Sequence, residues 1–163
     1  MRTVVLPGSF DPYTLGHHDL TRRAAAIAER VVIAVTHNPS KKGMLDLDAR
    51  TGAITECLAA DGLDSTVEVR TLGSGLLVDF CRKVEAGAVV RGLRSQLDLA
   101  YEEPMARMNH HLAGVDTIFL LTDSRYAHIS SSLVREVHAL GGDVTDMLPE
   151  PSLDALAAAG NVS

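Results

Sequence analysis

Short runs of β-branched and apolar residues alternate along this chain with longer segments of helical spacing. Strands that are apolar throughout, with helices between them, are typical of a parallel sheet that helices cover on both faces. The strands are expected at residues 3–6, 31–36, 67–71, 88–91 and 117–121, and the helices at about residues 17–29, 47–60, 76–86, 96–112, 131–140 and 152–160. The alternation predicts a doubly wound, Rossmann-like α/β fold with a five-stranded parallel sheet. Residues 1–163 are expected to form a single domain, since this length suits one substantial core.

Two stretches depart from the regular pattern. The run at residues 67–71 alternates polar and apolar side chains, which predicts a strand at an edge of the sheet. Pro104 falls inside an expected helix, where it deletes a backbone hydrogen bond and collides with the carbonyl four residues earlier. We therefore expect a kink near residues 100–103, or a division into two helices.

The fold class indicates where a ligand would bind. In open parallel sheets, ligands bind beyond the carboxyl ends of the strands, at the point where the strand order reverses. This rule selects the connections at residues 7–17, 37–44, 72–77, 91–98 and 123–132. The sequence contains neither the glycine fingerprint of dinucleotide sites nor a GxxxxGK[ST] loop, so a nucleotide site here would be of another kind.

The first of these connections has the features of an anion site. An apolar run ends at Pro7-Gly8, and a helix is expected to begin at about His17. The first amides of a helix lack partners within it, and the helix dipole favours negative charge there. Ser9 and Thr14 add hydroxyl donors, and His17 lies close enough to reach a phosphate. The alternative is an ordinary strand-to-helix turn with a capping serine and a surface histidine.

Two later connections carry positive charge. Lys41 lies in a loop bounded by proline and glycine, which suits either phosphate binding or simple exposure to solvent. Arg91 and Arg94 flank Gly92 at a strand end, where two guanidinium groups can clamp a phosphate and glycine allows a close backbone approach. Pairing of these arginines with carboxylates of the following helix is the alternative.

Three successive serines, residues 130–132, precede an amphipathic run. Serine is a favoured N-cap residue, and capping explains one of the three. The other hydroxyls, together with free helix amides, suit a triphosphate.

These motifs together resemble the bacterial phosphopantetheine adenylyltransferase family of the nucleotidyltransferase superfamily. Thr14-Leu15-Gly16-His17 is similar to the (H/T)xGH signature of that superfamily. The other stretches that carry the resemblance are Pro7-Gly8-Ser9-Phe10-Asp11-Pro12, Pro39-Ser40-Lys41-Lys42, Arg91-Gly92-Leu93-Arg94 with Tyr101-Glu102, Ile129-Ser130-Ser131-Ser132 with Val134-Arg135, and Gly142-Asp143-Val144.

The resemblance implies an activity and a set of site residues. The implied reaction transfers AMP from ATP to 4′-phosphopantetheine and gives dephospho-CoA and pyrophosphate, the penultimate step of coenzyme A synthesis. The implied ATP-binding residues are Ser9, Phe10, His17, Gly92, Leu93, Arg94, Glu102, Tyr126, Ala127, His128, Ile129, Ser130, Ser131 and Ser132. The implied substrate-binding residues are Ser9, Lys41, Leu77 and Arg91, and the implied catalytic residues are His17, Lys41 and Arg91.

Composition and spacing limit the cofactors and partners. Mg²⁺ is expected on the phosphates of ATP, because the sequence shows no dedicated carboxylate cage, and the adjacent histidine pairs lack the spacing of helical zinc ligands. A net charge of −6 offers nothing to nucleic acid or an anionic membrane. No signal peptide or membrane span is expected, and Cys57 and Cys81 are expected as reduced core thiols, so a cytoplasmic location follows. The resemblance implies a homohexamer, with coenzyme A or dephospho-CoA as a further ligand.

Three other functions remain to be weighed. A nicotinamide mononucleotide adenylyltransferase or a cytidylyltransferase would keep the fold and change the acceptor. A regulatory module would bind the nucleotide without turnover. A flavodoxin-like electron carrier fits the fold class but gives no reason for arginines at the strand ends.

Overall fold

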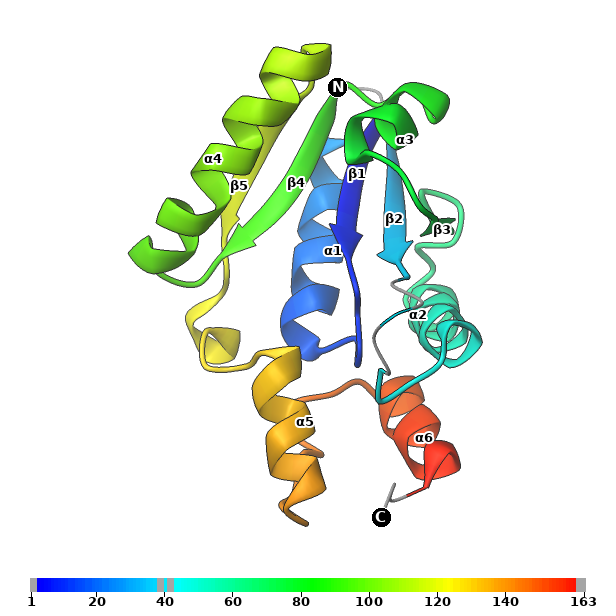
Figure 1. Cartoon of the computed structure of the whole chain (residues 1–163). Coiled ribbons are helices and arrows are strands. Elements are labelled where there is room, and N and C mark those ends of the chain that lie inside the picture. Colours follow the sequence, from blue (N-terminus) through cyan, green and yellow to red (C-terminus); the bar gives the residue numbers. More distant parts are fainter. Residues whose placement is uncertain (1–2, 38–39, 41–42, 161–163) are drawn as a thin grey trace.

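The computed structural model describes residues 3–37, 40 and 43–160. At its centre five parallel strands form one sheet (Figure 1). They are β1 (Thr3–Gly8), β2 (Arg30–Thr36), β3 (Val67–Leu72), β4 (Ala88–Leu93) and β5 (Asp116–Leu121), and their order across the sheet is β3-β2-β1-β4-β5. The order reverses between β1 and β4, so the carboxyl ends of these two strands form the switch point. The expected five-stranded parallel sheet is confirmed, and so is the edge position of β3.

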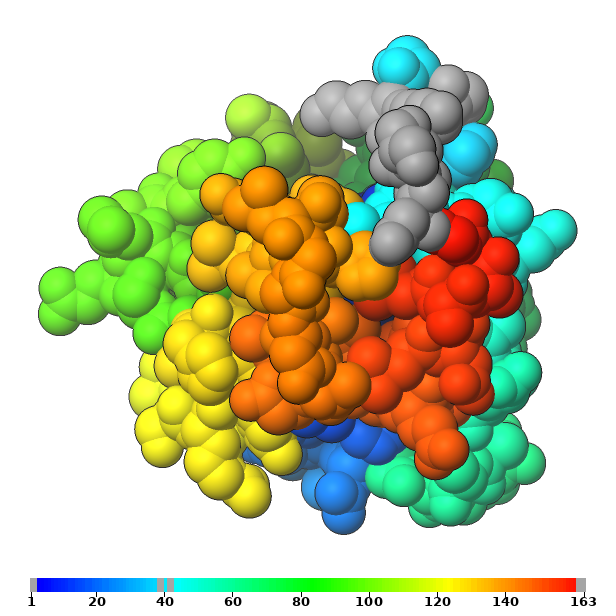
Figure 2. Space-filling view, turned by 90° about the horizontal axis from the view of Figure 1, so that it is seen from below, coloured from blue at the N-terminus to red at the C-terminus, as the bar shows by residue number. Residues whose placement is uncertain are grey.

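Within the described residues, six α-helices and one short 3-10 turn connect and cover the strands. The helices are α1 (Leu15–Ile27), α2 (Leu47–Ala60), α3 (Leu77–Lys83), α4 (Gln96–Ala113), α5 (Ser131–Ala139) and α6 (Glu150–Ala159), and the 3-10 turn η1 is Ser124–Tyr126. The first four helices cover the two faces of the sheet, as expected. Helices α5 and α6 lie instead beyond the carboxyl ends of the strands, as the view from that end shows (Figures 1 and 2).

Each face of the sheet contributes one layer of the core. Successive strand residues point to opposite faces, so Val4 and Leu6 pack with α1 and α2 while Val5 packs with α3. The two cysteines follow the same division. Cys57 lies in the first layer and Cys81 in the second, so the sheet separates them. Burial raises the pKa of each thiol to about 11, which agrees with the expectation of reduced core cysteines.

A third apolar cluster joins α5 and α6 to the carboxyl edge of the sheet. Its buried members are Leu45, Ile129, Val134, Val144, Leu148 and Leu156. They come from the segment before α2 and from the chain beyond β5, two regions distant in sequence. This cluster fixes the start of α5, which carries the three serines, over the switch point.

Helix α4 runs without a break from Gln96 to Ala113 although Pro104 lies inside it, so the alternative of two helices is wrong. Pro104 and Ala100 are both exposed. Water can therefore reach the carbonyl of Ala100 that has lost its usual partner, which lowers the cost of the interruption. No helix among residues 3–160 that the structure describes is long and apolar enough to cross a membrane.

Substitution of two isoleucines tests whether the apolar layer beneath α1 and α2 is packed as described. Ile54 of α2 is fully buried, whereas Ile27 at the end of α1 is 50% exposed. We expect Ile54→Ala to lower the free energy of unfolding by about 2–5 kcal/mol, because it leaves a cavity in a packed core. The matched control Ile27→Ala should cost less than about 1 kcal/mol. Urea unfolding of both variants measures the difference, and equal losses would contradict this description of the core.

Candidate active site

A cavity of about 740 Å³ opens at the switch point between β1 and β4. Its walls come from the end of β1 and the loop after it, the first turn of α1, the end of β4, the first half of α4 and the start of α5. The predicted site residues that line it are Ser9, Phe10, His17, Arg91, Gly92, Arg94, Glu102, Ile129, Ser130, Ser131 and Ser132. Four separate motifs of the sequence therefore converge on one cavity, which is called the nucleotide cavity below.

The loop between β1 and α1 has a compact conformation that glycine makes possible. Phe10 adopts a positive φ of 50°, and its buried ring folds back over Gly8. A Cβ at Gly8 would lie 2.9 Å from that ring, so any larger residue there must displace it. The ring also meets His17 edge-on, with 5.0 Å between the ring centroids. Gly8 therefore fixes the surroundings of His17 through Phe10.

His17 is held in one orientation and one tautomer by the start of its own helix. Thr14 is the N-cap of α1, and its hydroxyl accepts a hydrogen bond from the His17 amide. In return, the backbone N–H of Thr14 donates to Nδ1 of His17 at 3.1 Å. Because Nδ1 accepts, the ring proton of the neutral imidazole is on Nε2. The helix accordingly begins two residues earlier than expected, at Leu15.

The charge state of His17 follows from its environment. Burial, and then the positive charges of Arg91 and Arg94, lower the pKa of His17 to about 4. The ring of Tyr13 stacks on the imidazole at 5.8 Å, and the Tyr13 hydroxyl donates to Thr21. At neutral pH the cavity therefore contains a neutral imidazole that can donate one hydrogen bond from Nε2.

Arg91, at the end of β4, makes a bidentate pair with Glu102 of α4. Its Nε donates to one carboxylate oxygen at 2.8 Å and its Nη2 to the other, while Nη1 donates to the carbonyl of Pro7 at 2.8 Å. The carboxylate pairing that the sequence left as an alternative is therefore present. Contacts with the described residues use three of the five guanidinium N–H groups.

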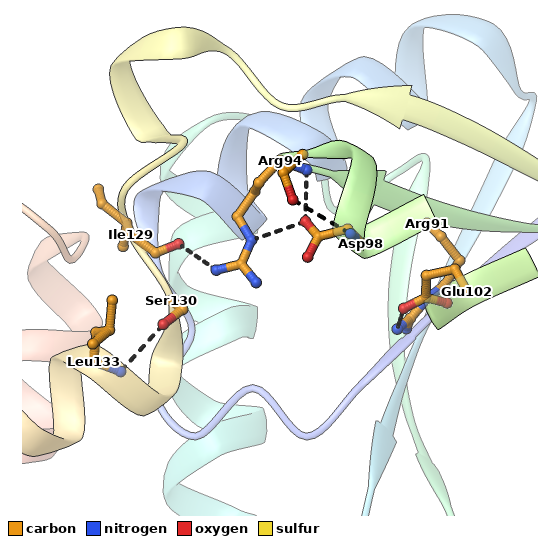
Figure 3. A network of polar contacts seen from close by, with 8 residues as sticks. Arg91, Arg94, Asp98, Glu102, Ile129, Ser130 and Leu133 are labelled. Carbon is orange, nitrogen blue, oxygen red and sulfur yellow. Dashed lines mark hydrogen bonds and ion pairs between the residues drawn. The ribbon is translucent and has the colours of Figure 1, made fainter. Parts of the chain in front are cut away.

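Arg94 connects the start of α4 to the serine segment (Figure 3). Its guanidinium reaches Asp98 through Nε at 3.3 Å and the carbonyl of Ile129 through Nη1 at 3.4 Å. Its backbone N–H also donates to Asp98, at 2.7 Å. Arg94 thus holds two walls of the nucleotide cavity together and adds positive charge to it.

The three serines have three different partners. Ser130 caps α5 by accepting from the amide of Leu133, as Figure 3 shows. The Ser131 hydroxyl donates to the carbonyl of Pro12 at 2.8 Å, and the Ser132 hydroxyl accepts from Arg135 at 3.2 Å. One serine is therefore a cap, as expected, and Ser131 ties the helix to the loop after β1.

Sequence reasoning assigned no role to Asp11, although it organises the same loop. Its carboxylate accepts from the amides of Met44 at 2.9 Å and Leu45 at 2.8 Å, and it is buried. A Cβ at Gly43 would lie 2.8 Å from this carboxylate. Asp11 therefore joins the loop after β1 to the segment that leads into α2. In the sequence, Asp11 stood out only as a member of the stretch from Pro7 to Pro12 that carries the family resemblance.

Two arginines also lacked an assigned role. Arg50 of α2 is only 6% exposed and donates to the carbonyls of Ser9 and Thr36 at 2.7 and 3.0 Å. Arg135 of α5 donates to the carbonyl of Asp11 at 2.6 Å. In the sequence, Arg50 falls on the same helical face as the apolar residues Ala53, Ile54 and Cys57, and this pattern could have indicated that it is buried.

The remaining predicted residues lie elsewhere. Leu93, Tyr126, Ala127 and His128 do not line the nucleotide cavity: Leu93 is buried and His128 is exposed. Leu77 begins α3 and packs with the core beneath that helix. Lys41 lies outside the described residues. The roles of all six stay predictions.

A second, larger cavity of about 1230 Å³ lies between α2, α6 and residues 43–46. It shares Ser9 and Arg135 with the nucleotide cavity. Among the described residues, no three His, Cys, Asp or Glu side chains are grouped as a protein metal site requires.

The assignment of His17 as a neutral donor can be tested by NMR of the imidazole nitrogens. We expect the Nε2–H tautomer at pH 7 and a midpoint near pH 4. Because this pKa lies below that of an unfolded histidine, protonation favours the unfolded chain, and the contribution to stability is lost as pH falls from about 6.5. A midpoint near 6.5, or the Nδ1–H tautomer, would contradict the geometry.

Comparison with known proteins places this site in a family. A family model described as Cytidylyltransferase-like matches residues 5–137. A phosphopantetheine adenylyltransferase of Clavibacter michiganensis subsp. michiganensis is 54% identical over 156 residues, which are 96% of each chain. A phosphopantetheine adenylyltransferase of Micrococcus luteus is 47% identical over 156 residues, which are 96% of this chain and 98% of that one.

Solved structures with little sequence identity share the fold. A protein from Vibrio parahaemolyticus assigned as a nicotinate-nucleotide adenylyltransferase superposes with a TM-score of 0.73 at 14% identity, over 99% of this chain and 96% of that one. A bifunctional NMN adenylyltransferase/ADP ribose pyrophosphatase from Francisella tularensis superposes with a TM-score of 0.66 at 16% identity, over 96% of this chain and 52% of that one. The sequence matches show that the chain belongs to the cytidylyltransferase-like family and, within it, to the phosphopantetheine adenylyltransferases.

Proposed function

We propose that this chain transfers AMP from ATP to 4′-phosphopantetheine and releases dephospho-CoA and pyrophosphate. The observation that carries the proposal is that His17, Arg91, Arg94 and the serines line one cavity in a chain 54% identical to a phosphopantetheine adenylyltransferase.

The reaction needs positioning and electrostatic stabilisation more than acid–base chemistry. The attacking phosphate oxygen is already anionic, so no general base is required. The difficulty is to hold two polyanions together with the attacking oxygen in line with the α-phosphorus. Positioning of this kind contributes roughly 7–11 kcal/mol in favourable cases, and preorganised donors aimed at developing charge add several more.

His17 is proposed as the donor to the α-phosphate. Its neutral Nε2–H is fixed by the acceptor role of Nδ1, so it needs no reorientation as charge builds on the phosphorus oxygens. A neutral donor also keeps its proton throughout the reaction, which suits a step that requires no proton transfer.

The other proposed roles follow the charges in the cavity. Arg91 keeps two N–H groups for the phosphate of the acceptor while it remains paired with Glu102. Lys41, Ser9 and Leu77 are proposed to complete the acceptor site. ATP is proposed to bind at Gly92, Arg94, Glu102 and Ser130–Ser132, with Phe10, Leu93, Tyr126, Ala127, His128 and Ile129 shaping that site.

Mg²⁺ is proposed to enter on the nucleotide phosphates. The described residues offer no carboxylate cage, whereas phosphate oxygens are ligands that Mg²⁺ prefers. When bound, the ion neutralises charge on the phosphate oxygens. Coenzyme A and dephospho-CoA are proposed as ligands of the same site, and no nucleic acid or membrane partner is proposed.

A homohexamer in the cytoplasm is also proposed. Helix α4 carries exposed apolar side chains, among them Leu97, Tyr101, Met105 and Met108. Such a face is typical of a subunit contact, which supports assembly.

The proposed acceptor is tested by measuring pyrophosphate release from ATP with a panel of acceptors. We expect release with 4′-phosphopantetheine and none above background with nicotinamide mononucleotide, nicotinate mononucleotide or phosphocholine. Release with a mononucleotide alone would identify a different acceptor. Binding of ATP with no release under any acceptor would indicate a module without turnover.

Variants of His17 test the mechanism. We expect His17→Ala to lower kcat by roughly 10²–10³ with little change in ATP affinity, as the loss of one such donor does elsewhere. His17→Gln places an amide N–H near the position of Nε2 and should recover part of that loss. If His17→Ala retains full kcat, or if His17→Gln is no better than His17→Ala at every pH, donation from a neutral ring is wrong.

A further inference from the structure

Tyr13 packs against the imidazole of His17 but is not part of the lining of the nucleotide cavity. Its ring stacks on the imidazole with 5.8 Å between the centroids and 22° between the planes. Tyr13 is only 1% exposed, whereas His17 and Phe10 line the cavity. Tyr13 is therefore out of reach of a ligand in that cavity, and any effect it has on the reaction passes through His17.

Two aromatic rings enclose the imidazole at different angles. Phe10 meets it edge-on at 83°, and the rings of Phe10 and Tyr13 meet at 64° with 5.7 Å between their centroids. Aromatic pairs favour offset and edge-to-face arrangements of this kind, and close packing keeps buried rings in one rotamer. The three rings thus form one packed unit, which limits tilting of the imidazole away from its place at the start of α1.

A second connection joins Tyr13 to the backbone of His17. The Tyr13 hydroxyl donates to Oγ1 of Thr21 at 2.9 Å, and the fully buried Thr21 hydroxyl donates in turn to the carbonyl of His17 at 2.9 Å. Burial raises the pKa of the Tyr13 hydroxyl above its usual range, so the group stays protonated and remains a donor. The hydroxyl therefore ties the ring of Tyr13 to the helix turn that carries His17.

We propose that Tyr13 is a positioning residue for His17: its ring excludes water from one face of the imidazole and holds the orientation in which Nε2 donates into the cavity. This inference rests on the proposed role of His17 in the reaction. A misplacement of about 1 Å in a catalytic group can cost roughly 100-fold in rate. A residue that fixes the imidazole therefore contributes to turnover without touching a substrate.

The charge state of His17 reports whether the ring of Tyr13 covers it. Burial is the first cause of the low pKa of His17, and Tyr13 supplies part of that burial. The titratable groups that face Tyr13 from α1 and α2 are His18, Cys57 and Asp61. The charged or titratable groups that line the cavity with His17 are Arg91, Arg94, Asp98, Tyr101, Glu102 and Arg135. A substitution of Tyr13 retains all of these groups, so a change in the titration of His17 reports the loss of the ring.

Tyr13→Leu removes the ring and keeps an apolar side chain. We expect kcat to fall roughly tenfold or more, because the donor loses its fixed position, while KM for ATP stays within about twofold. In an NMR titration, the midpoint of His17 should rise from about 4 toward 6.5, because water reaches the face that the ring covered.

Tyr13→Phe restores the ring without the hydroxyl. It should recover most of the kcat that Tyr13→Leu loses and return the midpoint of His17 to near 4, since the stacked ring is present again and Thr21 can still donate to the His17 carbonyl.

Val115→Ala is the matched control for a loss of core packing alone. Val115 is buried in the layer on the other face of the sheet, immediately before β5 and so at the amino end of the strands, opposite the cavity. This variant should be less stable than the wild type in urea, with kcat and the midpoint of His17 unchanged.

Three results would overturn the proposal. The first is a wild-type midpoint and kcat in Tyr13→Leu. The second is an equal loss of kcat in Tyr13→Phe and Tyr13→Leu, which would assign the effect to the hydroxyl. The third is a loss of kcat in Val115→Ala as large as that in Tyr13→Leu, which would make the effect one of stability. If Tyr13→Leu does not fold, Tyr13→Met decides by the same measurements, because its flexible side chain fills irregular space without a ring.

The NMR titration uses no substrate, so its outcome is independent of which acceptor the enzyme uses. A wild-type chain that releases no pyrophosphate with any acceptor would overturn the proposed function, whereas an unchanged midpoint and kcat in Tyr13→Leu would overturn only the role of Tyr13.

Discussion

Five carbonyl oxygens from Pro7, near the end of β1, to Tyr13, before α1, are each held by a side chain from another part of the fold. The pairs are Pro7 with Arg91, Ser9 with Arg50, Asp11 with Arg135, Pro12 with Ser131, and Tyr13 with Ser152. Buried backbone oxygens must be paired, and a loop cannot pair them within itself as a helix or strand does. The donors come from β4, α2, α5 and α6, so this loop fixes how those elements meet.

The way in which the loop is held also places positive charge beside it. Arg91, Arg50 and Arg135 supply three of the five donors, and two of these have no carboxylate partner in the described part of the chain. The neutral carbonyl groups accept hydrogen bonds from these arginines without cancelling the positive charge of the guanidinium groups. Burial, and then the positive charges of Arg91 and Arg94, lower the pKa of His17, which stays a neutral donor. Arg91 thus contributes both to the geometry of the loop and to the charge state of the imidazole.

Much of the fold and the centre of the site could be predicted from the sequence. The pattern of apolar and polar residues predicted the parallel sheet, the edge strand β3 and the helices on both faces. It could do so because strands and helices repeat with different periods, which short stretches of sequence reveal. The rule for strand ends then led to His17, Arg91, Arg94 and the serines, and all of these line the nucleotide cavity. The signal for a capping residue among the three serines was also correct, since Ser130 caps α5.

What the sequence by itself determined is therefore the order of strands and helices and which loops line the cavity at the switch point, because those depend on patterns among near neighbours and on the carboxyl ends of the strands. The contacts of Asp11, Arg50 and Arg135 were decided by the tertiary structure alone. The same is true of the placement of α5 and α6 beyond the sheet and of the continuity of α4. The Ser152 contact with Tyr13 joins residues 139 positions apart, and the Arg135 contact with Asp11 joins residues 124 apart. A side chain's partner across such a separation depends on how the whole chain packs, and no local pattern encodes it.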